Sequence, residues 1–247
     1  MKKCADTPAA RACPEPGRSS FDQLRTNGRS RRAPSPAVVL LTIAVLATSL
    51  SAWAQLDSGV PPAPPGRSST PAKAFSSGQL LAELRKGGYL LYFRHTATDF
   101  SRDDARSRSD DDCANQRPLT NEGRAQARAI GAAMRELGIP LGKVLASPRC
   151  RTMETAMLAF GRAEPSAIVR GGPARPENAD RYSELRTLLS TPVERGRNVI
   201  IASHGNPFFG VAGPPYLAEG EAAVLRPLGK DFEVVARIKV GDWAALE

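Results

Sequence analysis

The sequence GYLLYFRHTATD, residues 88 to 99, contains the strongest structural signal in the chain. Its apolar, aromatic-rich run from Tyr89 to Phe93 follows two glycines, a pattern typical of a buried strand in a parallel sheet. Arg94 and His95 come directly after this run, so we expect both side chains at the carboxyl end of the strand. Ligands bind at that edge in open α/β sheets. The stretch therefore predicts a site as well as a strand.

The second of the chain's two histidines, His204, has a similar setting. The apolar run from Asn198 to Ser203 predicts another buried strand, which His204 follows directly. For one such histidine alone, a structural hydrogen bond at a strand end is a sufficient explanation. Two histidines in equivalent positions favour a shared site instead.

A third segment lies between the two histidines. Val144 to Ala146 predicts a short strand, and the residues after Pro148 have the composition of a helix. Arg151 would lie near the first turn of that helix, at the same edge of the sheet as the two histidines.

These segments together resemble the histidine phosphatase superfamily, in its phosphoglycerate-mutase-like branch. The resemblance rests on the Arg94-His95 pair, the block SPRCRTMETA from Ser147 to Ala156, and Ser203-His204-Gly205. The segment LTNEGRAQA, Leu119 to Ala127, resembles the first long helix of that family. The resemblance extends from about residue 88 to residue 243. It implies an α/β fold, a three-layer α/β/α sandwich with a mostly parallel sheet, to which the alternation of predicted strands and helices also points.

The other elements follow from caps, turns and apolar periodicity. Met153, Met157 and Phe160 are predicted to pack in the core. In chain order we expect a helix over 78–86 capped by Ser77, a helix from Thr120 to about Leu137, a strand over 143–146, a helix over 150–160, a strand over 167–169, helices over 181–189 and 207–212, and closing strands over 221–226 and 232–240.

The expected chemistry is phosphoryl transfer without a cofactor. A phosphoryl group carries about two negative charges at neutral pH, and the planar guanidiniums of Arg94 and Arg151 match its oxygens. Nearby positive charge favours a neutral His95, the form that a nucleophile needs. The resemblance implies that His95 forms a phosphohistidine, that His204 stabilises the transferring group, and that Thr98 lies beside the phosphate.

The acid that protonates the leaving group is an open question. Only 52 residues separate Arg151 from His204, which suggests a short insertion where many relatives carry a catalytic glutamate. Small relatives of this kind include protein-phosphohistidine phosphatases, whose leaving group needs less help from an acid. The candidates are Glu177, Glu184, Glu219 and Glu221. We favour Glu219, although a solvated loop carboxylate explains it equally well.

The composition of residues 1–54 predicts that the protein is exported from the cytoplasm. A basic lead (residues 1–36) precedes an uncharged apolar run (residues 37–50) and the small-residue site Ala52-Trp53-Ala54, as in a secretory signal peptide cleaved before Gln55. The alternative is an uncleaved membrane anchor, because about 20 apolar residues can span a bilayer. Cell fractionation distinguishes the two. The predicted organisation is a signal peptide or anchor over 1–54, a Pro/Ser-rich linker over 55–76, and a histidine phosphatase domain over 77–247.

The distribution of charge along the chain limits which classes of binding partner we expect. The basic lead accounts for much of the net charge of +9, and the rest of the chain has no stripe of basic residues with interleaved aromatics. We therefore expect a small phosphorylated substrate and no nucleic acid, with membrane contact confined to the amino-terminal segment. Competing interpretations are a non-catalytic binder of phosphorylated ligands, a mutase, and a membrane-anchored phosphatase acting on envelope sugar or lipid phosphates.

Two cysteines follow the lead, Cys113 and Cys150, and we expect a disulfide between them in an oxidising compartment, worth about 3–4 kcal/mol. Two unpaired buried cysteines are the alternative. The loop over 100–115 carries eight Asp and Arg residues and is expected to be solvated, or to form a rim facing the substrate. Its adjacent carboxylates lack the spacing of a calcium loop, so we predict no metal site.

Overall fold

The computed structural model describes residues 75–172 and 180–246. The predicted signal peptide or anchor, nearly all of the predicted linker and Glu177 lie outside these ranges. Within them, no helix has the length and apolar character needed to cross a membrane.

One six-stranded mixed sheet forms the centre of the domain, in the order β3-β2-β4-β1-β5-β6. Strands β3, β2, β4 and β1 run parallel, whereas β5 is antiparallel to β1 and β6 is antiparallel to β5. This confirms the mostly parallel sheet. The strands are β1 (Leu90–Arg94), β2 (Leu141–Ala146), β3 (Glu164–Pro165), β4 (Asn198–Ser203), β5 (Ala222–Pro227) and β6 (Phe232–Ile238).

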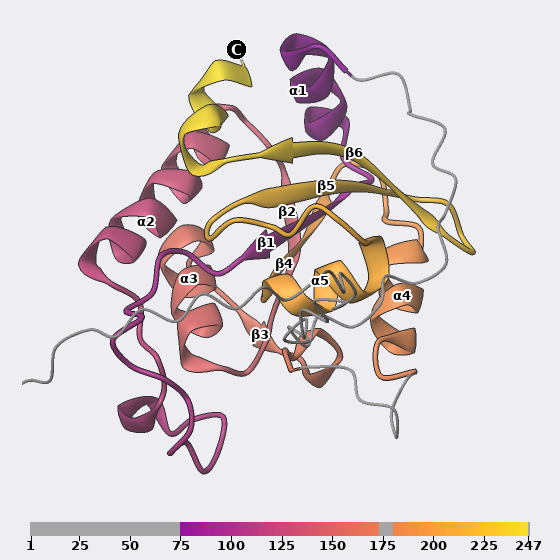
Figure 1. Ribbon diagram of the computed structural model, residues 1–247. Coiled ribbons are helices and arrows are strands. Elements are labelled where there is room, and N and C mark those ends of the chain that lie inside the picture. Colours follow the sequence, from indigo (N-terminus) through magenta and orange to yellow (C-terminus); the bar gives the residue numbers. More distant parts are fainter. Residues whose placement is uncertain (1–74, 173–179, 247) are drawn as a thin grey trace, which may run out of the picture. The chain divides into compact units, whose positions relative to one another are not determined.

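Helices cover both sides of this sheet (Figure 1). They are α1 (Ser77–Lys86), η1 (Cys113–Asn115), α2 (Asn121–Glu136), α3 (Cys150–Phe160), η2 (Ala167–Val169), α4 (Ser183–Ser190), α5 (Gly205–Ala212) and η4 (Val240–Leu246). The strand predicted over 167–169 is wrong, since those residues form η2 and the strand β3 lies just before them. Three apolar residues are too short a run to distinguish a strand from a helical turn.

Alternation along β1 divides the core into two layers. Leu91 and Phe93 pack with residues of α1, α2, α3 and η4, whereas Leu90 and Tyr92 pack with residues of α4 and α5. Successive side chains of a strand point to opposite faces, so one buried strand supplies both cores. The three-layer arrangement is therefore confirmed. Met157 is 49% exposed, however, and its predicted place in the core is wrong.

The pairing of β1 with β4 determines where the site lies. The two strands are parallel neighbours with Arg94 in register with Ser203. His95 and His204 each follow one of these paired residues, so the sheet places them side by side at its carboxyl edge. The backbone N–H of His95 donates to the carbonyl of Ser203 at 2.9 Å, which extends the ladder by one residue.

Candidate active site

His95 is buried, with 2% of its surface exposed. Its Nδ1 lies 3.0 Å from the backbone carbonyl oxygen of Thr96. A carbonyl can only accept, so Nδ1 carries the proton and Nε2 the lone pair. Burial, opposed by this hydrogen bond and assisted by the charges of Arg151, Arg94 and Arg117, lowers the pKa of His95 to about 3. The ring is therefore neutral near pH 7, as a nucleophile requires.

His204 lies beside it. The ring centroids are 5.5 Å apart and the rings meet nearly edge to face. Nε2 of His204 shares a hydrogen bond of 2.9 Å with the hydroxyl of the buried Ser147, and Tyr92 donates to the His204 carbonyl at 2.9 Å. Burial and the charge of Arg151 lower the pKa of His204 well below its usual value. The two predicted histidines thus share one site.

Arg151 extends into this site from the first turn of α3. Its side chain is nine-tenths buried, and Nη1 contacts both carboxylate oxygens of Asp104, at 3.0 and 2.9 Å. Its Nε is buried and has no hydrogen-bond partner among the described residues. A buried donor without a partner is costly. Arg151 also lines a polar cavity together with His204.

Arg94 and Glu219 also lie near His95. Arg94 donates to the Leu217 carbonyl at 2.8 Å and lies 3.4 Å from the Glu219 carboxylate. Glu219 also accepts from the hydroxyl of Thr98 at 2.6 Å and from its backbone N–H at 3.2 Å. Its Oε1 is 3.8 Å from Nδ1 of His95. Glu219 therefore contacts the protonated ring nitrogen, and no described contact joins it to Nε2.

The other glutamates considered as leaving-group acids lie elsewhere. Glu221 accepts from the backbone N–H of Ala218 at 2.7 Å and is 3.8 Å from Arg237. Glu184 is an exposed residue in the first turn of α4. Neither has a described contact with either histidine.

A polar cavity of about 220 Å³ opens beside His204. His95 is not in its wall. The cavity is lined by Asp104, Arg149, Arg151, Gly171, Gly172, His204 and Asn206. Of these, only Arg151 and His204 were predicted as site residues from the sequence. Arg117 is a further missed residue, because its charge helps to lower the pKa values of both histidines. Only its position just before the Leu119 helix segment could have suggested a role.

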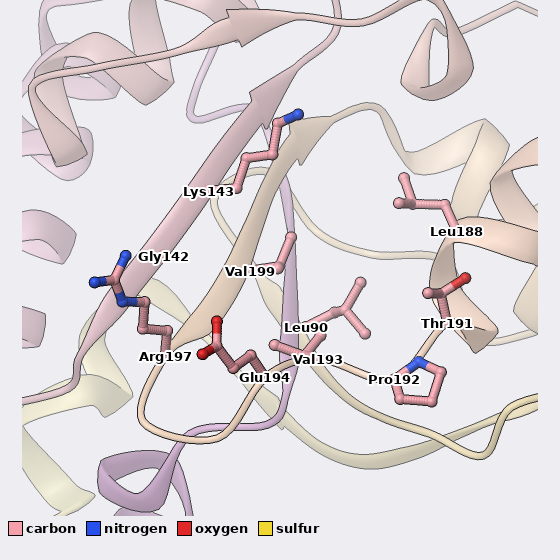
Figure 2. A pocket seen from close by; sticks show the side chains of 10 residues that line it. All are labelled: Leu90, Gly142, Lys143, Leu188, Thr191, Pro192, Val193, Glu194, Arg197 and Val199. Atoms are coloured by element: carbon pink, nitrogen blue, oxygen red, sulfur yellow. The ribbon is translucent and has the colours of Figure 1, made fainter.

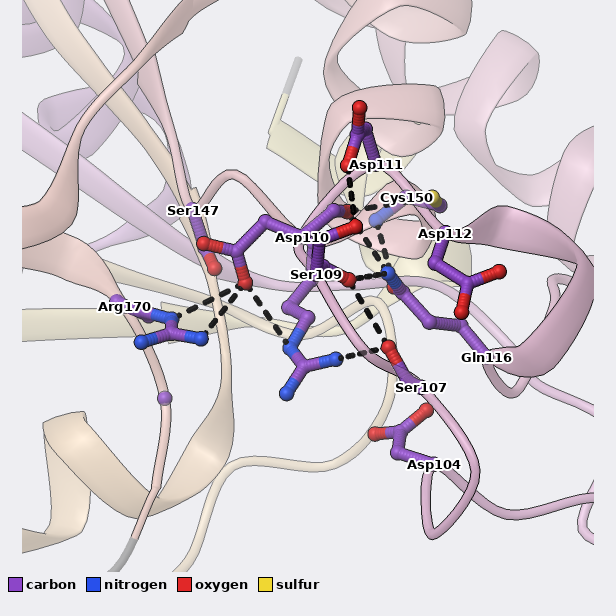
Figure 3. A network of polar contacts seen from close by, with 12 residues as sticks. Asp104, Ser107, Ser109, Asp110, Asp111, Asp112, Gln116, Ser147, Cys150 and Arg170 are labelled. Atoms are coloured by element: carbon purple, nitrogen blue, oxygen red, sulfur yellow. Dashed lines mark hydrogen bonds and ion pairs between the residues drawn. The ribbon is translucent and has the colours of Figure 1, made fainter.

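The charged loop over 100–115 is folded against the start of α3. Cys113 and Cys150 form the predicted disulfide, with Cα atoms 5.6 Å apart. The buried Gln116 accepts from the backbone N–H of Cys150 at 3.0 Å and donates to the carbonyls of Ser109 and Asp110 at 3.2 and 2.7 Å. Figure 3 shows this network. The loop is therefore a rim of the site as well as a solvated segment.

Two other cavities are larger. One of about 300 Å³ lies at the opposite edge of the sheet, among Leu90, Lys143, Glu194, Arg197 and Val199 (Figure 2), and contains none of the predicted site residues. Another of about 720 Å³ lies beside the disulfide and shares Arg151 with the polar cavity. No cluster of potential metal ligands occurs among the described residues.

Part of the chain matches a model of a known protein family. Residues 90–172 match the family model described as histidine phosphatase superfamily (branch 1). The match covers less than half of the chain. The match includes Arg94, His95 and Arg151, while His204 and Glu219 lie beyond it. A search of curated proteins gave no match.

Several solved structures are similar to the chain at low identity. The protein histidine phosphatase SixA complexed with tungstate is 16% identical, with 64% of this chain and 99% of that chain covered and a TM-score of 0.45. YhfR of Bacillus stearothermophilus is 16% identical, with coverage of 60% and 95% and a TM-score of 0.40. The Rv3214 product of Mycobacterium tuberculosis is 20% identical, with coverage of 60% and 96% and a TM-score of 0.44.

Proposed function

We propose that this histidine phosphatase domain hydrolyses phosphomonoesters or phosphoramidates, with His95 as the nucleophile. The observation that carries the proposal is the state of His95. The imidazole of His95 is buried and neutral, and its Nδ1–H donates to the Thr96 carbonyl. Its lone pair is therefore on Nε2. It lies beside His204, and the charge of Arg151 acts on its ring.

In the first step, Nε2 of His95 attacks phosphorus, the bond from phosphorus to the leaving oxygen or nitrogen breaks, and the leaving group takes its proton from solvent. In the second step, water attacks phosphorus and the phosphorus–nitrogen bond breaks. One proton of that water stays on the phosphate product, the other goes to solvent, and His95 returns to its neutral form with the proton still on Nδ1. Arg94, Arg151 and His204 stabilise the charge of the transferring group. Each such donor contributes about 3–4 kcal/mol, by analogy with oxyanion donors.

In this scheme Glu219 stabilises the charge on His95 and does not protonate the leaving group. Formation of the nitrogen–phosphorus bond makes the imidazole positively charged, with the proton still on Nδ1. The Glu219 carboxylate, 3.8 Å from Nδ1, stabilises that charge, while its contacts with Arg94 and Thr98 hold the carboxylate in place.

The test is to trap the intermediate. Rapid mixing with p-nitrophenyl phosphate should give a burst of nitrophenol equal to the enzyme concentration, and the protein should retain acid-labile phosphate. His95→Ala should lose the burst, the label and turnover, while its thermal unfolding shows that it is folded. Turnover by folded His95→Ala would overturn the assignment.

The competing interpretation is a non-catalytic binder of phosphorylated ligands on the same fold. It predicts phosphate binding without burst or label in the unaltered protein. A panel of phosphorylated sugars, lipids and phosphoramidates then distinguishes among hydrolytic substrates, including the envelope phosphates expected of a membrane-anchored relative.

A further inference from the structure

Asp104 occupies an unusual place for a carboxylate in a site that binds anions. It comes from the charged loop, yet both of its oxygens contact Nη1 of Arg151. Its Oδ1 also accepts from the backbone N–H of Arg117 at 2.8 Å. It lines the polar cavity together with His204. A phosphoryl group that binds Arg151 there must therefore share the guanidinium with this carboxylate.

The electrostatic consequence is repulsion. A phosphate group bound to Arg151 carries the same sign of charge as the Asp104 carboxylate, which contacts that guanidinium, and like charges repel at close range. Asp104 is about one-third exposed, so solvent weakens this repulsion. Its charge still cancels part of the attraction that Arg151 exerts on phosphate.

The rest of the loop is built to keep this carboxylate in place. The disulfide joins Cys113 to Cys150, the neighbour of Arg151 in sequence. Asp110 lies between two guanidiniums, 3.5 Å from Arg149 and 2.8 Å from Arg170. The disulfide therefore anchors the loop that carries Asp104 to the helix that carries Arg151.

We propose that Asp104 lowers the affinity of the site for phosphate by partly neutralising Arg151, and that the Cys113–Cys150 disulfide holds it in this position. The proposal rests on the function proposed above. Asp104 is here a positioning residue that acts through Arg151. It weakens binding of product phosphate and so favours its release after each turnover.

The test compares Asp104→Asn with Asp103→Asn. Asn keeps an oxygen that can accept from Arg117 and Arg151 but removes the charge. Asp103 is an exposed neighbour that accepts only from the N–H of Ala105, at 2.9 Å, among the described contacts, and serves as the matched control. Calorimetric titration of the full chain with inorganic phosphate should give about tenfold tighter binding for Asp104→Asn and no change for Asp103→Asn.

Kinetics should separate this role from a purely structural one. With p-nitrophenyl phosphate, Asp104→Asn should lower KM and the inhibition constant of phosphate together, without raising kcat. If Asp104 merely supports the orientation of Arg151, the variant instead binds phosphate more weakly, which overturns the proposal. Unchanged binding overturns it as well.

The disulfide is tested on the oxidised and reduced full chain. Mild reduction, or Cys113→Ser combined with Cys150→Ser, should tighten phosphate binding when Asp104 is present. Either change should have little effect in the Asp104→Asn background, because loss of the disulfide and loss of the carboxylate charge act on the same contact between Asp104 and Arg151. Additive effects would overturn the role of the disulfide. If the unaltered protein binds phosphate but shows neither burst nor turnover, the proposed function is refuted. Phosphate binding by Asp104→Asn and Asp103→Asn then still decides whether this inference holds.

Discussion

The chemistry of His95 depends on groups that contact its two ring nitrogens differently. Nδ1 is bound by the Thr96 carbonyl and faces Glu219, whereas burial keeps the ring neutral. The tautomer follows from a backbone carbonyl, which no side-chain substitution removes. The charge near the ring comes from Glu219 and is therefore the part that mutation can test.

Glu219→Gln should lower kcat by about tenfold, roughly 1.4 kcal/mol in the barrier, with a smaller change in KM. The amide still accepts from Thr98 but no longer stabilises the positive charge that forms on His95. Steady-state kinetics with p-nitrophenyl phosphate measures this. Glu184→Gln, at an exposed position on α4, is the control and should behave like the unaltered protein.

A leaving-group acid would give a different result. If Glu219 protonates the leaving group, Glu219→Gln should slow substrates with poor leaving groups far more than p-nitrophenyl phosphate. An equal loss on alkyl and aryl phosphates supports stabilisation of the ring charge. A loss confined to alkyl phosphates contradicts it.

At the scale of elements, the start of α2 presses against the loop that follows β1. A Cβ atom added to Gly123 would lie 2.0 Å from the carbonyl oxygen of Ala97. Thr120 caps this helix, and its backbone N–H also donates to the Ala97 carbonyl, at 3.0 Å. The start of α2 and the loop after β1 thus meet at the Ala97 carbonyl, two residues from His95 in sequence.

Gly123→Ala should therefore reduce both stability and activity. The new methyl group must displace the Ala97 carbonyl, and with it Thr98 and its contact with Glu219. We expect a loss of about 2–3 kcal/mol in the free energy of unfolding, as for overpacking of a close contact, and at least a tenfold loss in kcat/KM. Urea unfolding and steady-state kinetics measure the two quantities.

Gly78→Ala is the matched control for this change. Gly78 lies in α1 with nothing within 4 Å of an added Cβ, so the substitution should raise stability by up to about 1 kcal/mol through helix propensity. If Gly123→Ala also stabilises the protein, the close approach of α2 to the loop is contradicted.

The sequence could predict elements that have strong boundaries. Cys150–Phe160 and Asn198–Ser203 were predicted to the residue, because Pro148 and His204-Gly205 mark their ends. The meeting of His95 and His204 could be predicted for the same reason. Each follows a buried strand, and the two strands are parallel neighbours whose carboxyl ends share one edge of the sheet.

Asp104 could not be predicted in this way. It lies in a loop rich in Asp and Arg, a composition that equally describes a solvated segment. Its contact with Arg151 joins residues 47 apart in sequence and depends on how the loop folds back onto α3. Arg149 is similar, since its contacts with Ser107 and Asp110 come from the same folded loop. Charge pattern alone does not specify such pairings.

At the scale of the whole molecule, the two buried histidines couple stability to pH. In the unfolded chain each has a pKa near 6.5, whereas in the folded protein burial lowers both pKa values. Below pH 6.5 the unfolded chain binds protons that the folded protein does not. Stability is therefore complete above that pH and is lost as the pH falls.

Between pH 7 and pH 5, His95 alone should cost about 2 kcal/mol in the free energy of unfolding, and His204 should add a loss of the same sign. Urea unfolding at the two pH values measures the sum. Asp104, whose pKa is lowered from 3.8 by its hydrogen bond from Arg117 and by Arg151, against the opposing effect of burial, loses its contribution only at lower pH and does not interfere. His95→Asn should reduce the pH dependence by the His95 share. Equal stability at pH 7 and pH 5 would show that the histidines titrate normally in the folded protein. The claim that burial keeps His95 neutral as a nucleophile would then be wrong.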